Sequence, residues 1–150
     1  MARALIAVGT ALALLVGGLA LAVYLTRDED NIQVDNLLSE RFTREVATAS
    51  ANRTHLDLRA IAPFDWERVL IVARGTPDAE ISRRLGYEWT GTLGFETGSK
   101  LILLDEEGRV ARFFDYRGEG AFAGIETPIA ELARDQAVFR VRGLEITPKE

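Results

Sequence analysis

The hydrophobic pattern of the chain begins with one long run that carries no charge. Residues Ala4 to Leu25 occupy 22 positions without a charged side chain. A helix of that length rises about 33 Å, which is enough to cross the hydrocarbon core of a bilayer. We therefore predict an N-terminal transmembrane anchor over residues 1–25, joined to the rest of the chain by a polar linker over residues 26–33.

The same run also fits a cleaved signal peptide. Ala20, Leu21 and Ala22 form the small-x-small pattern that signal peptidases cut. Against cleavage, the apolar character continues to Leu25, and Tyr24 lies where an interfacial aromatic residue anchors a span. A retained anchor is the favoured prediction, and cleavage near Ala22, which releases a secreted domain, is the alternative.

The residues that flank the run indicate its orientation. Only Arg3 and the terminal amine provide positive charge before it, and Arg27 follows directly after it. A three-residue tail ahead of a long apolar run is typical of a signal sequence, whose carboxyl side is translocated. We expect a single-pass protein in the cell membrane, with its C-terminal domain outside the cytoplasm.

Small residues form a ridge along this predicted helix. Gly9, Ala13 and Gly17 repeat at intervals of four positions, so their side chains line one side of the helix. Such a ridge permits the close approach of a second helix, although an alanine- and leucine-rich run also produces this spacing by chance. These three residues are the candidates for helix packing in the membrane.

From residue 34 onward the pattern becomes that of a globular domain, beginning with a helix. Six apolar side chains keep helical spacing, at Val34, Leu37, Leu38, Phe42, Val46 and Ala49. Asp35 is available as the N-cap. The pattern predicts an amphipathic helix of about four to five turns whose apolar side packs on a sheet of the domain.

Strand and turn signals follow this helix. The stretch His55 to Arg59 alternates weakly, and Arg68 to Ala73 contains a continuous apolar run that is typical of a strand buried on both faces. A short helix is predicted next, with Thr76 as its N-cap and Pro77 as its first residue. It is expected to end at Gly86.

The rest of the chain predicts a hairpin and a last strand. Two strands, Lys100 to Leu104 and Arg109 to Tyr116, are joined by a turn over Asp105 to Gly108. A helical turn is expected over Pro128 to Arg134, and the last strand over Ala137 to Arg142. Side chains alternate between the two faces of that last strand. One face carries Phe139 and Val141, and the other, which is largely polar, carries Val138, Arg140 and Arg142.

This order of elements predicts an α+β fold. There are too few crossover helices for an all-parallel sheet, and the hairpin is antiparallel. We expect an N-terminal transmembrane helix followed by a single small domain over residues 34–150. Its sheet is expected to be antiparallel or mixed, with four or five strands and with the helices on one face.

Charge and composition exclude several classes of protein. The chain has 18 Lys and Arg against 23 Asp and Glu, a formal charge of −5, which disfavours nucleic acid as a partner. It contains no cysteine, so disulfides, thiolate ligands and a lipidated cysteine are all excluded. The predicted partners are the lipid bilayer and a protein in the cell envelope.

Residues with catalytic or metal-binding patterns are scarce. His55 is the one histidine, so no site with two histidine ligands exists, and the serines lack the context of a nucleophile elbow. Acidic runs over 28–30 and 105–107 lack the ligand spacing of a calcium loop, and no glycine-rich stretch has the lysine of a phosphate loop. We predict no catalytic residues, no metal and no cofactor.

Four residues are candidates for binding. Trp66 and Trp89 lie at the ends of the predicted strand and helix, and with Arg68 and Tyr87 they include the residue types that dominate binding hot spots. If the two tryptophans lie near each other, the four line one ligand or partner surface. The other interpretation is that the tryptophans belong to the core, where tryptophan is usually found.

The segment that contains these residues resembles a known group of proteins. It reads Pro63-Phe64-Asp65-Trp66-Glu67-Arg68-Val69, then an apolar strand, then a helix opened by Thr76-Pro77 and closed by Leu85-Gly86, with Trp89 behind. This order is similar to that of small uncharacterised bacterial exported lipoproteins that carry an FDW-acidic-basic-V segment. The resemblance implies a location in the bacterial envelope and no particular activity. The lipidated cysteine that holds those proteins is absent, and the apolar run replaces it as the anchor.

Two classes of function are consistent with these observations. The favoured one is a non-enzymatic, membrane-anchored module outside the cytoplasm that binds a protein or another envelope component. The alternative is a secreted ligand-binding or enzymatic domain that uses dispersed carboxylates and arginines.

Overall fold

The computed structural model describes residues 34–91 and 98–149 of the 150-residue chain. These residues belong to one compact unit, Ile32–Glu150. The predicted span Ala4 to Leu25, its ridge of Gly9, Ala13 and Gly17, and the linker 26–33 lie outside the described residues. Within the described ranges, no helix has the length and apolar character needed to cross a membrane.

Three α-helices, one short 3-10 helix and eight strands make up the described part of the chain. In chain order they are α2 (Asn36–Asn52), β1 (His55–Asp57), α3 (Leu58–Ile61), β2 (Arg68–Val72), α4 (Asp78–Leu85), β3 (Ser99–Leu104), β4 (Val110–Tyr116), β5 (Ala121–Phe122), β6 (Ile129–Ala133), η1 (Arg134–Gln136), β7 (Val138–Arg142) and β8 (Glu145–Pro148).

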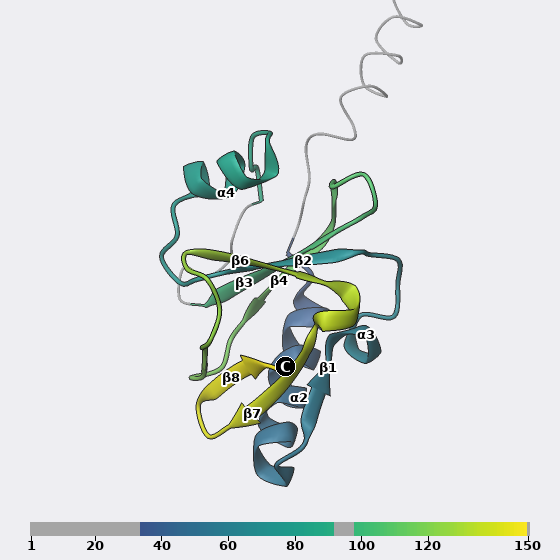
Figure 1. Ribbon diagram of the computed structural model, residues 1–150, viewed down its shortest axis with the longest axis vertical. Coiled ribbons are helices and arrows are strands. Elements are labelled where there is room, and N and C mark those ends of the chain that lie inside the picture. The colour runs from purple at the N-terminus through teal and green to yellow at the C-terminus, as the bar shows by residue number, and fades with distance from the viewer. Residues whose placement is uncertain (1–33, 92–97, 150) are drawn as a thin grey trace, which may run out of the picture. The chain divides into compact units, whose positions relative to one another are not determined.

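The strands form two four-stranded sheets (Figure 1). One is antiparallel in the order β4-β3-β2-β6, and the other is mixed in the order β1-β7-β8-β5, with β5 parallel to β8. The predicted α+β class is therefore confirmed. The expectation of one sheet with every helix on the same face is wrong, because the chain builds two sheets and places helices on both faces of the antiparallel one.

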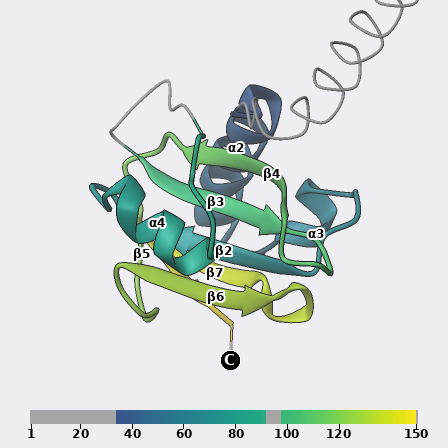
Figure 2. The same cartoon turned by 90° about the horizontal axis from the view of Figure 1, so that it is seen from above.

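The antiparallel sheet is buried on both faces. Val69, Leu101 and Phe114 project into a large core that α2 and the mixed sheet complete. Leu70 and Ile102 project to the opposite face, into a smaller core that includes residues of α4. Figure 2 shows α4 and α2 on the two sides of this sheet. Burial on both faces explains why β2 and β3 read as continuous apolar runs instead of alternating ones.

Helix α2 is capped and packed largely as its sequence predicts. The Asp35 carboxylate accepts a hydrogen bond from the Leu38 amide at 3.0 Å. The buried side of the helix consists of Leu38, Ser39, Phe42, Val46 and Ala49. The expectation that Leu37 joins this side is wrong, because the helix is rotated so that Ser39 is buried and Leu37 is 80% exposed.

The short helix and the hairpin also follow their sequence signals closely. Helix α4 ends at Gly86, whose φ is +82°, but it begins after Pro77 instead of Thr76. The Thr76 hydroxyl donates to the Ala73 carbonyl at 2.7 Å, so it closes a turn and does not cap the helix. In the β3–β4 turn, the Gly108 amide donates to the Asp105 carbonyl at 3.1 Å.

Strands β5, β6 and β8 are not among the elements expected from the sequence. The predicted helical turn over Pro128 to Arg134 is wrong, because Ile129–Ala133 is strand β6, paired antiparallel with β2. Five residues are too few to form a helix unaided, and the free edge of β2 supplies hydrogen-bond partners that the sequence does not reveal. The chain also adds β8 after β7, through a two-residue hairpin loop at Gly143 and Leu144.

Candidate functional site

The sheet separates the two tryptophans of the predicted binding set. Trp66 is 1% exposed in the large core, where its indole nitrogen donates to the Ala62 carbonyl at 3.0 Å. Trp89 is 5% exposed in the smaller core, on the opposite face, with its ring centroid 4.9 Å from that of Phe113. The condition that Trp66 and Trp89 lie near each other is therefore not met, and both belong to the hydrophobic cores, in agreement with the other interpretation of the sequence. The cause is that α4 carries the chain across to the second face before residue 89.

Arg68 and Tyr87 each make polar contacts within the domain. The Tyr87 hydroxyl accepts a hydrogen bond from the Val110 amide at 3.1 Å, and burial raises the pKa of the Tyr87 phenol. Arg68 donates to Glu131 at 3.0 Å, and Glu131 also accepts from Arg84 at 2.6 Å. The charge of Arg68 is thus already compensated within the domain, and a role for these residues in binding stays a prediction.

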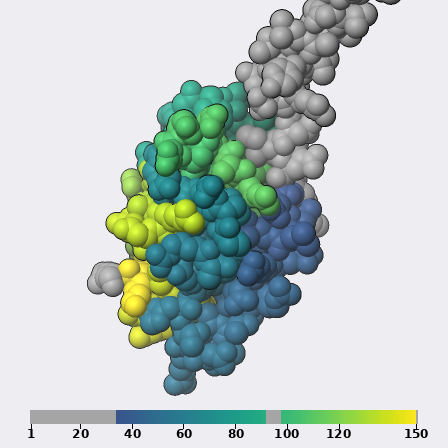
Figure 3. All heavy atoms as spheres, turned by 90° about the vertical axis from the view of Figure 1, so that its right-hand side faces the viewer, coloured from purple at the N-terminus to yellow at the C-terminus, as the bar shows by residue number. Residues whose placement is uncertain are grey.

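A different set of residues surrounds an open groove at one end of the mixed sheet. The groove has a volume of about 650 Å³. It lies where β1 begins and β7 ends, beside the last turn of α2, and is lined by Ser50, Arg53, His55, Arg140, Val141, Arg142 and Gly143. Seen from the side, the end of the domain that carries the C-terminus of α2 lies opposite the end that carries the β3–β4 turn (Figure 3).

Strand alternation and register place three of the basic side chains. Phe139 and Val141 point into the core and are buried, so Arg140 and Arg142 on the same strand point outward. His55, the first residue of β1, is paired directly with Arg140. The sequence predicted this polar face of the last strand, but it did not indicate that His55 lies beside it.

The C-terminal end of α2 supplies the fourth basic side chain. Arg53 directly follows the helix in the left-handed conformation, with φ 55° and ψ 39°. Its amide donates to the Ser50 carbonyl at 3.4 Å, and the Thr54 amide donates to the Ala49 carbonyl at 3.0 Å, which is the Schellman pattern. The Ser50 hydroxyl donates to the Gly143 carbonyl at 3.2 Å and joins the helix end to the β7–β8 turn.

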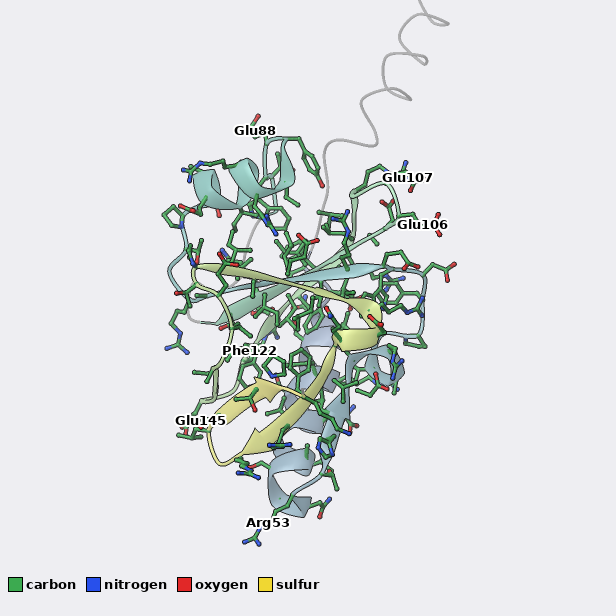
Figure 4. The ribbon with its side chains drawn as sticks, in the orientation of Figure 1. Arg53, Glu88, Glu106, Glu107, Phe122 and Glu145 are labelled. Atoms are coloured by element: carbon green, nitrogen blue, oxygen red, sulfur yellow. The ribbon has the colours of Figure 1, made fainter. Side chains whose placement is uncertain are left out.

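The arginines of this groove form no ion pair with a carboxylate of the described residues. Among the ion pairs formed between described residues, none includes Arg53, Arg140 or Arg142. Glu145 of β8 lies opposite Arg142 in the register of the mixed sheet, but the two side chains do not form an ion pair. Glu145 also lies well away from Arg53 (Figure 4).

Asp57, two residues after His55, is also unavailable to the groove. It is bound by Arg59 at 2.7 Å, and its hydrogen bond to that guanidinium lowers the pKa of the Asp57 carboxyl. The groove therefore presents three guanidinium groups and an imidazole to solvent.

A second cavity, of about 320 Å³, lies between α4 and the segment before β6, and it has a mixed charge. Its arginines are both engaged: Arg83 pairs with Glu80 at 3.3 Å and Arg84 with Glu131 at 2.6 Å. Paired charges of this kind stabilise the surface without offering a free binding group. The basic groove is thus the stronger candidate of these two cavities.

The chemistry that the groove can perform is binding. A guanidinium is protonated at all accessible pH values and donates hydrogen bonds in a planar fork that matches carboxylate and phosphate oxygens. Across residues 34–91 and 98–149, no group of three or more His, Asp or Glu side chains is arranged to hold a metal ion. Sequence reasoning missed Arg53 and His55 as site residues, and only the polar face of β7 pointed toward this location.

Comparison with known proteins adds no further assignment, since no family model, no curated protein and no solved structure matches this chain.

Proposed function

We propose that this protein is a non-enzymatic binding module of the cell envelope that captures an anionic component through the basic groove. The observation that carries the proposal is the gathering of Arg53, Arg140 and Arg142 around one cavity without an ion pair to any described residue, in a chain whose formal charge is −5. Charges of one sign repel one another when they are gathered at one place, and a bound anion removes that repulsion.

The proposed location follows from the apolar run and from the resemblance to exported lipoproteins. In this proposal, residues 1–25 hold the protein in the membrane as a single span, and the domain lies outside the cytoplasm. The mass of the protein isolated from its native membrane distinguishes a retained anchor from a cleaved one. The mass of the full chain supports the anchor, and a chain that begins just after Ala22 contradicts it.

The binding function is tested with two labelled polyanions of different chemistry, polyglutamate and polyphosphate. The full chain, in a nonionic detergent, is titrated with each probe and binding is followed by fluorescence anisotropy. We expect the double variant Arg140→Gln, Arg142→Gln to bind at least one probe about a hundredfold more weakly, because each charge-assisted hydrogen bond contributes about one to two powers of ten in affinity.

The matched control is the pair Arg44→Gln, Arg74→Gln. It removes the same amount of charge, and its exposed arginines lie outside the groove lining. This control is expected to bind both probes within about twofold of the wild type. Equal weakening by the two double variants shows that binding depends on net charge alone and contradicts the proposed groove.

A further inference from the structure

We infer that the anion captured by the groove is a phosphate group, and that Arg53 is the residue that gives the groove its preference for phosphate over carboxylate. The inference rests on the proposed binding function and names the ligand class of the same groove. It starts from an arginine at a position where the backbone favours glycine.

Arg53 occupies a position at which stability favours another residue. It is the one non-glycine residue with a positive φ among the described residues, and it ends a Schellman pattern, where glycine is the usual residue. A side chain with a Cβ atom is disfavoured in this conformation. Within the described part of the chain, the Arg53 side chain forms no ion pair and no hydrogen bond that compensates for this penalty. The positive charge of Arg53 interacts favourably with the dipole at the C-terminal end of α2, but this offsets only part of the backbone penalty. The binding of a ligand accounts for the rest.

The number and origin of the donors favour phosphate. The three guanidinium groups come from two separate elements, the end of α2 and the strand β7, and His55 of β1, which is paired with Arg140, also lines the groove. One carboxylate has two oxygens and a single negative charge, which one or two arginines satisfy. A phosphate group is tetrahedral, so its two or three free oxygens, which carry one or two negative charges, do not share one plane with the substituent as carboxylate oxygens do, and they engage guanidinium groups that approach from different sides.

The size of the groove indicates that the phosphate is part of a larger molecule. A volume of about 650 Å³ is within the range of sites for small organic ligands and leaves room beside a phosphate group. Sugar phosphates, polyol phosphates and phospholipid head groups share this chemistry. The test below therefore includes one arm for a soluble ligand and one for a lipid.

The decisive variant is Arg53→Gly, tested on the full chain in nanodiscs of phosphatidylcholine. Glycine relieves the left-handed conformation, so we expect the unfolding temperature to rise by about 4 °C. We expect the same variant to bind labelled polyphosphate about tenfold more weakly, while its affinity for polyglutamate changes by less than about threefold. A variant that is more stable and binds less well excludes unfolding as the reason for the lost affinity.

Two further variants separate charge from backbone. Arg53→Lys keeps the charge and is expected to retain most of the polyphosphate affinity. Arg53→Gln keeps a side chain in the left-handed conformation without charge, so it is expected to lose affinity and gain no stability. The inference is overturned if Arg53→Gly binds polyphosphate as the wild type does, or if it loses affinity for both probes equally.

Competition identifies the source of the phosphate. Glycerol phosphate in solution is expected to displace polyphosphate from the wild type, and acetate at the same ionic strength is expected to leave it bound. If the ligand is a lipid head group, nanodiscs that contain phosphatidylglycerol weaken polyphosphate binding by the wild type and not by Arg53→Gly. If neither phosphate compound competes, the inference fails. The proposed function fails on a separate result, namely that the Arg140, Arg142 double variant binds both polyanions no more weakly than the Arg44, Arg74 control does.

Discussion

The hydroxyl oxygen of Ser39 in α2 lies 2.8 Å from a carboxylate oxygen of Asp115 in β4, and both side chains are buried. The Asp115 amide also donates to the Ser39 oxygen at 3.2 Å, and Arg117 holds the second carboxylate oxygen at 3.1 Å. These contacts attach the first half of α2 to the edge strand of the antiparallel sheet. They also explain why a serine, and not Leu37, lies on the buried side of the helix.

Replacing Ser39 by alanine is therefore expected to destabilise the domain by about 1–3 kcal/mol, because a buried carboxylate and a buried amide each lose a partner. The free energy of unfolding from urea titration measures this loss. Thr48→Ala is the matched control, since the Thr48 hydroxyl makes only a local contact with the Arg44 carbonyl on the exposed side of the same helix. Its expected effect is within about 0.5 kcal/mol, and equal losses in the two variants contradict the role assigned to Ser39.

The two tryptophans are expected to respond differently to replacement by phenylalanine. Trp66→Phe removes the hydrogen bond to the Ala62 carbonyl, whereas the indole nitrogen of Trp89 is buried and makes no hydrogen bond to a described residue. Both variants lose volume from a core, but the first also leaves a polar atom unpaired. We expect Trp66→Phe to be less stable than Trp89→Phe by about 1 kcal/mol in urea unfolding. The reverse order contradicts this assignment.

Alanine at Gly118 is expected to destabilise the domain by about 1–3 kcal/mol. A Cβ atom there would overlap the ring of Tyr116, which is buried and accepts a hydrogen bond from the Gly120 amide at 3.3 Å. The comparison is Gly75→Ala, where the added Cβ meets open space and only the positive φ of 78° opposes the change. That variant is expected to lose about 1 kcal/mol, and a larger loss at Gly75 than at Gly118 counts against the overlap argument.

Alkaline pH is expected to destabilise the domain, chiefly through the buried phenol of Tyr116 and less through that of Tyr87, which is 40% exposed. Burial raises the pKa of Tyr116 above the ordinary value of 10.0, and the same cause raises the pKa of Tyr87. The folded state therefore keeps a proton that the unfolded state releases. The stability is complete below the unfolded pKa and falls as the pH rises from about 10 through the raised pKa of the folded state.

The measurement is the urea midpoint between about pH 8 and about pH 11. Tyr116→Phe removes one of the two phenols and is expected to lose less stability over this range than the wild type, although it starts from a lower value because the contact with Gly120 is gone. If the two chains show the same dependence on pH, the phenol of Tyr116 makes no contribution to it.

Helix caps and turns could be predicted from the sequence wherever the hydrogen-bonding groups that form them lie within a few residues of one another. Asp35 caps α2 through an amide three residues away, Gly86 ends α4, and the turn from Asp105 to Gly108 closes through its own backbone. The buried character of β2 was also predictable, because a strand covered on both faces needs apolar residues at consecutive positions. The membrane span over Ala4 to Leu25 stays a prediction, which rests on length and polarity alone.

Pairing between distant segments was decided by the tertiary structure alone. Ile129–Ala133 becomes a strand because the edge of β2 is open to it, and Trp66 and Trp89 are separated because α4 crosses to the second face of the sheet. The basic groove has the same origin, since Arg53, His55 and Arg140 meet only when the end of α2, β1 and β7 are brought together. The polarity of each residue is a local property that can be read along the chain, whereas the charge of a surface depends on which distant residues share it.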